Sequence, residues 1–383
     1  MTQSSLQEYF GETQELVRLS VRKFVEKEIK PHINEWEEAG EFPRTLYEKA
    51  GSAGILGIGY PEEFGGTGDD LFSKIAASEE LMRSTSGGLV ASLGSLDIGL
   101  PPVCRWATES IKQQVVPDVI AGKKISALAI TEPSGGSDVA NIKTRALKKD
   151  GHYIVNGSKT FITSGQRADY YTVAVRTGEA GFAGISLLLI ERDRLGFSRG
   201  ENLKKTGWWA SDTAELFFDD CKVPQGNLIG AENSGFIAIM SNFERERLSL
   251  CVMANMTSEI AIEQCLVYVK QRKAFDRPIG KFQVTRHKLA EMATQLEASK
   301  ALTYRLAARM QAGQSVVKEI SMAKNFATSV SDRVTYDAVQ IFGGMGYMRE
   351  SVVERLARDN RILSIGGGTY EIMNEVIAKQ LGL

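Results

Sequence analysis

The first candidate for chemistry is a carboxylate on the apolar face of a helix. Residues 235–250 read GFIAIMSNFERERLSL, and an apolar stripe at helical spacing runs through Phe236, Met240, Phe243 and Leu250. Glu246 lies three residues after Phe243 and four before Leu250, so it falls on the face expected to be buried. Burying an unpaired carboxylate raises its pKa or requires a partner, which Arg247 could be. The spacing alone favours a catalytic group and a structural ion pair equally.

A second candidate is the glycine-containing turn TEPSGGSD, residues 131–138. A strand leads into it, and its hydroxyls and backbone N–H groups can approach a polar ligand because glycine leaves room. In SKTFITSG, alternation predicts that Lys159, Phe161 and Thr163 share one strand face, where a ring and a hydroxyl could contact a planar ligand. A plain polar loop and ordinary sheet packing explain the same two segments.

The composition limits the function classes. The 383 residues are 43% hydrophobic and 24% charged with a net charge of −1, which indicates a soluble globular protein of two or three domains. This charge balance gives no field that favours nucleic acid or an anionic membrane. The four cysteines form no CxxC pair and the histidines number three, so we expect no metal site and a reducing compartment.

The N-terminus has neither an apolar core nor an Arg-rich character, so it predicts no targeting segment. No uninterrupted apolar run reaches the roughly 18 residues of a membrane span. We therefore expect a cytoplasmic protein that does not enter a membrane.

Three domains are predicted to position these candidates. Residues 1–122 show helical periodicity, beginning with a helix over 5–30 that includes Leu6. Residues 123–233 contain short β-branched runs and Asn156-Gly157, a hairpin signal. Residues 234–383 return to helical periodicity, with long stretches near 235–272, 281–312 and 315–344 that indicate a four-helix bundle. The prediction is a mainly α protein with a central β domain.

Five motifs together resemble one family. They are TEPSGGSD (131–138), FITSG (161–165), VKQRKAF (269–275), QIFGGMGY (340–347) and GGGTYEIM (366–373). In this order they closely resemble the flavin-dependent acyl-CoA dehydrogenases, over nearly the whole chain. The resemblance implies an N-terminal helical domain, a middle β-barrel-like domain and a C-terminal four-helix bundle, with non-covalent FAD held between the last two.

The resemblance also implies roles for single residues. Thr131 and Thr163 match positions that hydrogen-bond the flavin ring, Phe161 matches an aromatic that flanks it, and Ser137 lies near flavin and acyl-CoA. A neighbouring subunit is implied to bind the rest of FAD through Arg272, Phe275, Gln283, Gln340 and Gly344, and Thr369 and Glu371 also contact FAD. Asp276 departs from the glycine common after the Phe, which affects local loop shape.

The family reaction removes an α-proton from an acyl-CoA thioester while the β-hydride passes to flavin N5. Many members use a Glu that aligns with Gly367, which has no side chain. Isovaleryl-CoA and long-chain acyl-CoA dehydrogenases instead place the base in a Glu-Arg-Leu segment on the earlier helix, as in Glu246-Arg247-Leu248. The resemblance thus implies that Glu246 is the base, and that the Gly367 amide hydrogen-bonds the thioester oxygen.

Further implications concern the substrate and the partners. Arg247 matches an active-site arginine, and Glu244, about 200° from Glu246 around the helix, matches a position near the pantetheine arm. We expect a branched or medium- to long-chain acyl-CoA, electron-transfer flavoprotein as the acceptor, and a homo-oligomer, expected to be a tetramer. The alternatives are a flavin monooxygenase or oxidase and a non-catalytic binding protein. Leu93, Leu96 and Trp106 could line the acyl end, and Trp208-Trp209 the CoA entrance, although packing explains both sets.

Overall fold

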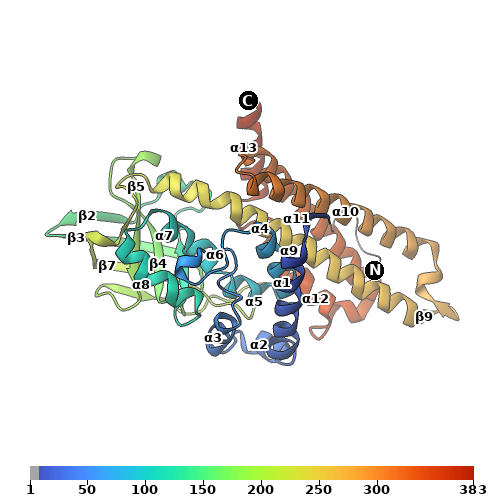
Figure 1. Cartoon of the computed structure of the whole chain (residues 1–383). Helices are drawn as coiled ribbons and strands as arrows, with labels where there is room; N and C mark the ends of the chain where they lie inside the picture. The colour runs from blue at the N-terminus through green and yellow to red at the C-terminus, as the bar shows by residue number, and fades with distance from the viewer. Residues whose placement is uncertain (1–7) are drawn as a thin grey trace.

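The computed structural model describes residues 8–383 and has the predicted order of helical, β and helical parts (Figure 1). The first part contains α1 (Glu12–Phe24), α2 (Ile33–Ala39), α3 (Thr45–Ser52), α4 (Leu71–Met82), α5 (Gly87–Leu93), α6 (Leu96–Gly99), α7 (Pro101–Trp106) and α8 (Glu109–Ile120). The predicted helix over 5–30 corresponds to α1 followed by a π-helical turn, Val25–Ile29. Leu6 lies outside the described residues.

The middle part is one eight-stranded sheet. Its strands are β1 (Ser126–Ala129), β2 (Arg145–Lys149), β3 (His152–Thr163), β4 (Tyr170–Arg176), β5 (Ile185–Glu191), β6 (Phe197–Arg199), β7 (Thr213–Pro224) and β8 (Leu228–Ile229). They follow the order β6-β7-β3-β2-β4-β5-β8, and β1 pairs with β4 in parallel. Nearly every residue of β4 and β5 is buried, so this β-branched region forms the centre of the domain.

The hairpin predicted at Asn156-Gly157 is wrong. These residues lie inside β3, where the pairing with β7 shifts register. The turn before β3 is Asp150-Gly151, with φ of 47° and 78°, as the mirror-image turns of hairpins require. Gly157 is needed for another reason, because a Cβ there would lie 2.7 Å from the Thr144 Cα. A glycine that a strand needs for a close backbone approach therefore looks the same in sequence as a glycine in a turn.

The shared face predicted for Lys159, Phe161 and Thr163 is also wrong. A second irregularity lies between Lys159 and Ile162, and Phe161 has φ of 59°. Lys159 is fully buried, whereas Phe161 is 69% exposed. One bulge in the strand interrupts the alternation on which the prediction depended.

The last part is a helical bundle built on one long helix. It comprises α9 (Gly235–Gln271), the hairpin β9 (Lys273–Ala274) and β10 (Arg277–Pro278), α10 (Gln283–Gln311), α11 (Val317–Phe342), α12 (Val352–Asn360) and α13 (Tyr370–Leu381). α9 runs from the β domain through the middle of the molecule to the end that carries β9 (Figure 1). It has the length and mean hydropathy of a membrane-crossing helix. However, 67% of its most apolar window is buried inside the protein, as in the central helix of a bundle.

Candidate active site

Glu246 and Gly367 meet although they are far apart in sequence. Glu246 lies on α9, and Gly367 lies in the loop between α12 and α13. A Cβ added to Gly367 would lie 3.6 Å from Glu246 Oε1 and 2.6 Å from Leu250 Cδ1. The Glu246 carboxylate is therefore next to the backbone of the position where the sequence lacks a side chain.

The Glu246 carboxylate is in an unusual environment. Its Oε2 is buried and has no hydrogen-bond partner within residues 8–383. Burial raises the pKa of Glu246 to about 7, against the opposing effects of the Arg247 and Lys324 charges. A carboxyl group of this kind is present in both protonation states near neutral pH, which suits a general base.

Within residues 8–383, Arg247 bonds to the Gly367 loop and to α11 instead of forming an ion pair with Glu246. Its Nε donates to the Gly367 carbonyl at 3.4 Å, and its Nη1 donates to Ser321 Oγ at 3.5 Å. Burial lowers the pKa of Arg247, while the charges of Glu246 and Glu244 oppose the shift. The guanidinium thus links α9 to this loop. Glu244, on the same helix, is half-buried.

The loop that contains Gly366, Gly367 and Gly368, here called the glycine loop, is fixed on its other side by α11 and by a helix cap. Lys324 Nζ donates to the Gly368 carbonyl, and Asn325 donates to the Tyr370 carbonyl at 3.0 Å. Thr369 caps α13 by accepting from the Ile372 N–H, with Glu371 in the first turn. Lys324 escaped the sequence analysis. Its signal was a lysine four residues after Ile320, on the apolar side of its helix.

A buried carboxylate holds the turn at 131–138 against β3. Glu132 accepts hydrogen bonds from the Lys143 and Thr144 amides at 2.6 and 2.9 Å and from Lys159 Nζ at 2.9 Å. The Thr160 N–H also donates to the Thr131 carbonyl at 2.9 Å. These bonds bring the two motif segments side by side. Motif analysis did not assign this role to Glu132 and Lys159.

The residues expected around a flavin ring lie on these two segments. Thr131 and Thr163 are half-buried, and Ser137 is exposed at the turn. Phe161 exposes an aromatic ring from a left-handed backbone conformation. A non-glycine residue in that conformation is strained, and such strain is concentrated at ligand sites. The arrangement offers hydroxyls and an open ring face to a planar polar ligand.

A second group of predicted residues lies at the other end of the bundle. Tyr268 stacks on Phe342 at 4.1 Å between ring centroids, which joins the end of α9 to the end of α11. This end carries the five residues expected to act from a neighbouring subunit, Arg272, Phe275, Gln283, Gln340 and Gly344. Phe275 is 88% exposed at the tip of the β9–β10 hairpin. Along α9, Arg272 is roughly 40 Å from Glu246, so one chain does not bring the two groups together.

Asp276 keeps the hairpin shape that the sequence left open. It adopts φ of 61°, next to Phe275 at φ of 51°. Asp tolerates the left-handed region better than most residues, so the turn forms without the glycine.

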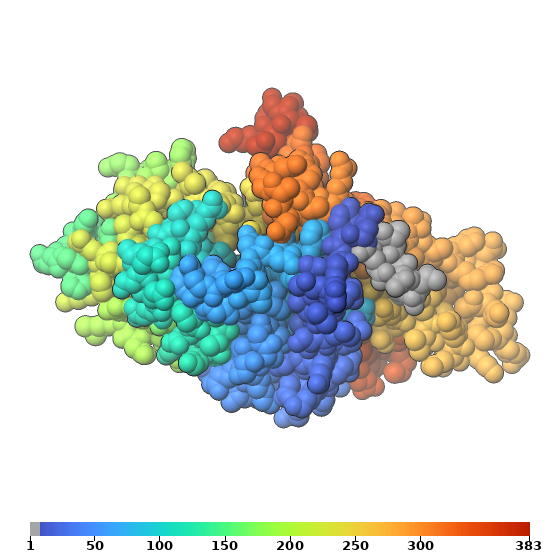
Figure 2. Space-filling model, in the orientation of Figure 1, coloured from blue at the N-terminus to red at the C-terminus, as the bar shows by residue number. Residues whose placement is uncertain are grey.

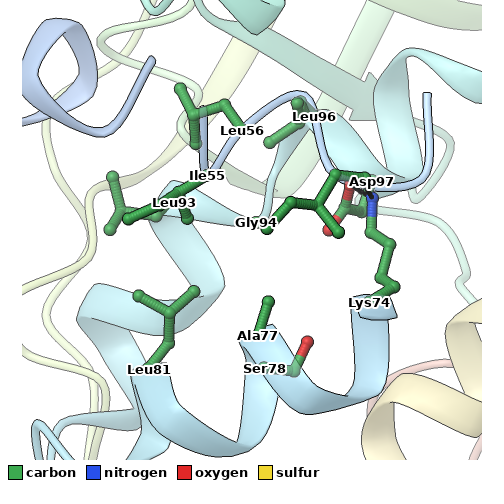
Figure 3. Close-up of a pocket in the computed structure, with 11 residues that line it drawn as sticks. Ile55, Leu56, Lys74, Ala77, Ser78, Leu81, Leu93, Gly94, Leu96 and Asp97 are labelled. Carbon is green, nitrogen blue, oxygen red and sulfur yellow. Dashed lines mark hydrogen bonds and ion pairs between the residues drawn. The ribbon is translucent and has the colours of Figure 1, made fainter. Parts of the chain in front are cut away.

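The remaining candidates have packing roles. Trp208 N–H donates to Asp359, and the Arg349 and Arg358 guanidinium groups both lie over the Trp209 ring. Leu93 and Leu96 line a cavity of about 30 Å³ beside α4, which is too small for an acyl chain (Figure 3).

The sequence matches three family models that follow one another along the chain. They are the N-terminal, middle and C-terminal domains of acyl-CoA dehydrogenase, at residues 11–123, 127–221 and 233–382. The chain belongs to the acyl-CoA dehydrogenase family. It is 41% identical to the mitochondrial long-chain specific acyl-CoA dehydrogenase of Sus scrofa, over 100% of this chain and 89% of that protein.

Solved structures agree with this assignment. A probable acyl-CoA dehydrogenase from Mycobacterium abscessus is 48% identical and superposes with a TM-score of 0.96, over 98% of this chain and 100% of that chain. A glutaryl-CoA dehydrogenase from Mycobacterium smegmatis in complex with FADH2 is 27% identical, with a TM-score of 0.93 over 98% of this chain and 96% of that chain. This chain is an FAD-dependent acyl-CoA dehydrogenase. The exposed Phe161 ring and the hydroxyls of Thr131 and Thr163 fit its flavin.

Proposed function

We propose that the protein converts an acyl-CoA thioester to the trans-2-enoyl-CoA with Glu246 as the catalytic base. The observation that carries this proposal is the half-buried Glu246 beside the backbone of Gly367, with its Oε2 buried and without a hydrogen-bond partner among the described residues. The α-proton of a thioester is weakly acidic, so its removal needs a carboxylate sheltered from water and donors to the carbonyl oxygen. Both are available at this point of the structure.

The chain's own residues divide the work. Glu246 takes the α-proton, and the Gly367 N–H donates to the thioester oxygen, where negative charge develops. Arg247 orients the loop through the Gly367 carbonyl. Ser137 and Glu244 lie along the path proposed for the acyl-CoA. Bound FAD accepts the hydride from the β-carbon.

We propose a branched or medium- to long-chain acyl group as the substrate. Gly366, Gly367 and Gly368 place no side chain of their own beside the proposed base, although Leu250 and Met373 pack closely against Gly367 and Gly368. The resemblance to the long-chain enzyme of Sus scrofa supports the longer chains. Anaerobic flavin bleaching with straight, branched and aromatic acyl-CoAs would rank these substrates.

We also propose that electrons leave singly to electron-transfer flavoprotein and that the active unit is a homo-oligomer, expected to be a tetramer. The oligomer is supported by the separation of Arg272 from Glu246 and by apolar side chains exposed near β9 and on α13, including Phe275, Val284, Tyr347 and Leu381. In Figure 2 the bundle end near β9 and the C-terminal helix project from the body of the molecule.

Glu246→Gln tests the base. The variant should retain FAD, because it removes no proposed flavin contact, and should lose reduction of the flavin by acyl-CoA by a factor of at least about 10². Glu244→Gln is the comparison on the same helix; since Glu244 is proposed to lie along the acyl-CoA path, it should raise the KM for acyl-CoA more than it lowers the maximal rate of flavin reduction. Near wild-type reduction by Glu246→Gln would contradict the assignment, and loss of reduction in Glu244→Gln alone would move the role to Glu244. Rapid consumption of O2 by the reduced protein would favour the oxidase alternative.

A further inference from the structure

Lys324 is a fully buried lysine that the proposed reaction does not use. It lies on α11 with no exposed surface, and burial lowers the pKa of Lys324 to about 8. Burying an ammonium group is unfavourable unless its charge is needed or compensated. Its hydrogen bond goes to a neutral acceptor, the Gly368 carbonyl, rather than to a carboxylate. One hydrogen bond to a carbonyl does not compensate for burying the Lys324 ammonium group, so it does not explain why a lysine occupies this position.

The loop that receives this bond is held at three carbonyl oxygens. Arg247 from α9 donates to Gly367, and Lys324 and Asn325 from α11 donate to Gly368 and Tyr370. Each donor approaches a carbonyl, so none of them occupies the N–H of Gly367. The two helices thus fix the peptides 367–368 and 368–369, which directly follow the N–H proposed to meet the thioester oxygen.

The charged groups that act on Glu246 come from two helices, α9 and α11. Arg247 on α9 and Lys324 on α11 are the charged groups that act on Glu246. Glu244 acts on Arg247, and Cys251 acts on Lys324. Burial raises the pKa of the Cys251 thiol to about 12, so Cys251 stays neutral at working pH. Lys324 is therefore one of two positive charges that oppose protonation of the base.

We propose that Lys324 is a positioning residue for the dehydrogenation, which anchors the loop that carries the Gly367 N–H through the Gly368 carbonyl and keeps Glu246 ionised by its charge. This inference rests on the proposed function, because it needs Glu246 to be the base. It gives α11 a role at the reacting end of the site.

Lys324→Met and Lys324→Arg separate the charge from a structural role. Lys324→Met removes a nearby positive charge, so the acid limb of the pH profile for flavin reduction should move up by about half a unit to one unit. kcat should fall by about tenfold or more while KM changes less, since the amide contact strengthens in the transition state. Lys324→Arg keeps the positive charge. The acid limb of its pH profile should therefore match that of the wild type, even if its rate of flavin reduction is lower.

Lys300→Met is the matched control, because Lys300 is a half-buried bundle lysine that pairs with Glu259 away from the glycine loop. It should lower the thermal midpoint and leave the acid limb in place. An unchanged acid limb in a folded, FAD-loaded Lys324→Met, or an equal shift in Lys300→Met, overturns the inference. If Glu246→Gln remains active, the proposed function fails instead, so the two failures are distinguishable.

Discussion

At the scale of single residues, Glu246 sets function against stability. Its pKa is raised from 4.5 to about 7, so the folded state binds the proton more tightly than the unfolded state. Stability therefore falls as pH rises from about 4.5 to 7 and stays lower above that range. The ionised carboxylate costs about 3 kcal/mol at pH 8, from 1.36 kcal/mol per pKa unit. An inactive variant should accordingly be the more stable one.

Glu246→Gln should raise the thermal midpoint at pH 8, where the wild-type carboxylate is charged, and should change it much less at pH 5, where the carboxyl is protonated. Scanning calorimetry of the FAD-loaded protein at both pH values measures this difference. An equal gain at the two pH values would mean that removal of the charge is not its cause.

Gly367 and Gly366 are adjacent glycines with different demands. Gly367 has φ of 65°, and an added Cβ would come within 2.6 Å of Leu250. At Gly366 the nearest atom to an added Cβ is 3.6 Å away, an ordinary contact. Gly367→Ala should therefore destabilise the protein by about 1–2 kcal/mol through the left-handed backbone alone and should slow flavin reduction. Gly366→Ala, the matched control, should stay close to wild type in both measurements.

The same conflict with Leu250 makes the outcome at Gly367 more specific. Leu250→Ala combined with Gly367→Ala should lower the thermal midpoint by less than the sum of the two single losses, because the flexible end of Leu250 is the atom in the way. Additive losses in the double variant would show that backbone strain, rather than the contact with Leu250, dominates.

At the scale of elements, the buried pair Glu132–Lys159 ties the turn at residues 131–138, proposed to contact the flavin, to β3. Lys159→Met would leave Glu132 buried without its cation, which typically costs about 3–5 kcal/mol. We expect a lower thermal midpoint and faster loss of FAD on dilution, because the turn that carries Thr131 loosens. Lys148→Met, at an exposed β2 lysine, should change neither by more than a small amount. Tight FAD retention in Lys159→Met would separate the pair from cofactor binding.

Helices with a regular hydrophobic period could be predicted from sequence, whereas strands with register shifts could not. The stretches that became α9, α10 and α11 were predicted to within a few residues, because many turns of 3.6-residue periodicity accumulate a strong signal. β3 was misread twice, since its register shifts depend on the partner strand β7, which local sequence does not reveal. Glu246 could be singled out as the candidate base because a carboxylate interrupted an apolar stripe. Lys324 was missed because lysines are ordinarily exposed.

At the scale of the whole molecule, the predicted cofactor residues lie at two distant ends of one chain. Thr131 and Thr163 lie in the β domain, whereas Arg272 follows the far end of α9 (Figure 1). If each FAD contacts both sets, it must lie between two chains, and each site then combines Glu246 of one chain with Arg272 of another. Symmetric dimers of this kind contain two such composite sites.

Two inactive variants should therefore complement each other. Glu246→Gln lacks the base, and Arg272→Ala lacks a cofactor contact from the neighbouring chain, so either homo-oligomer should reduce its flavin poorly. In a mixed dimer both changes fall in one site and the other site is intact. Random pairing of equal amounts should restore about one quarter of the wild-type sites.

The measurement is acyl-CoA-dependent flavin reduction after co-expression with two different affinity tags and purification through both. Because double-tag purification enriches mixed dimers, activity should rise toward half. Tagged mixtures no more active than the separate variants would show that Glu246 and Arg272 serve the same site from one chain, or that Arg272 has no part in it.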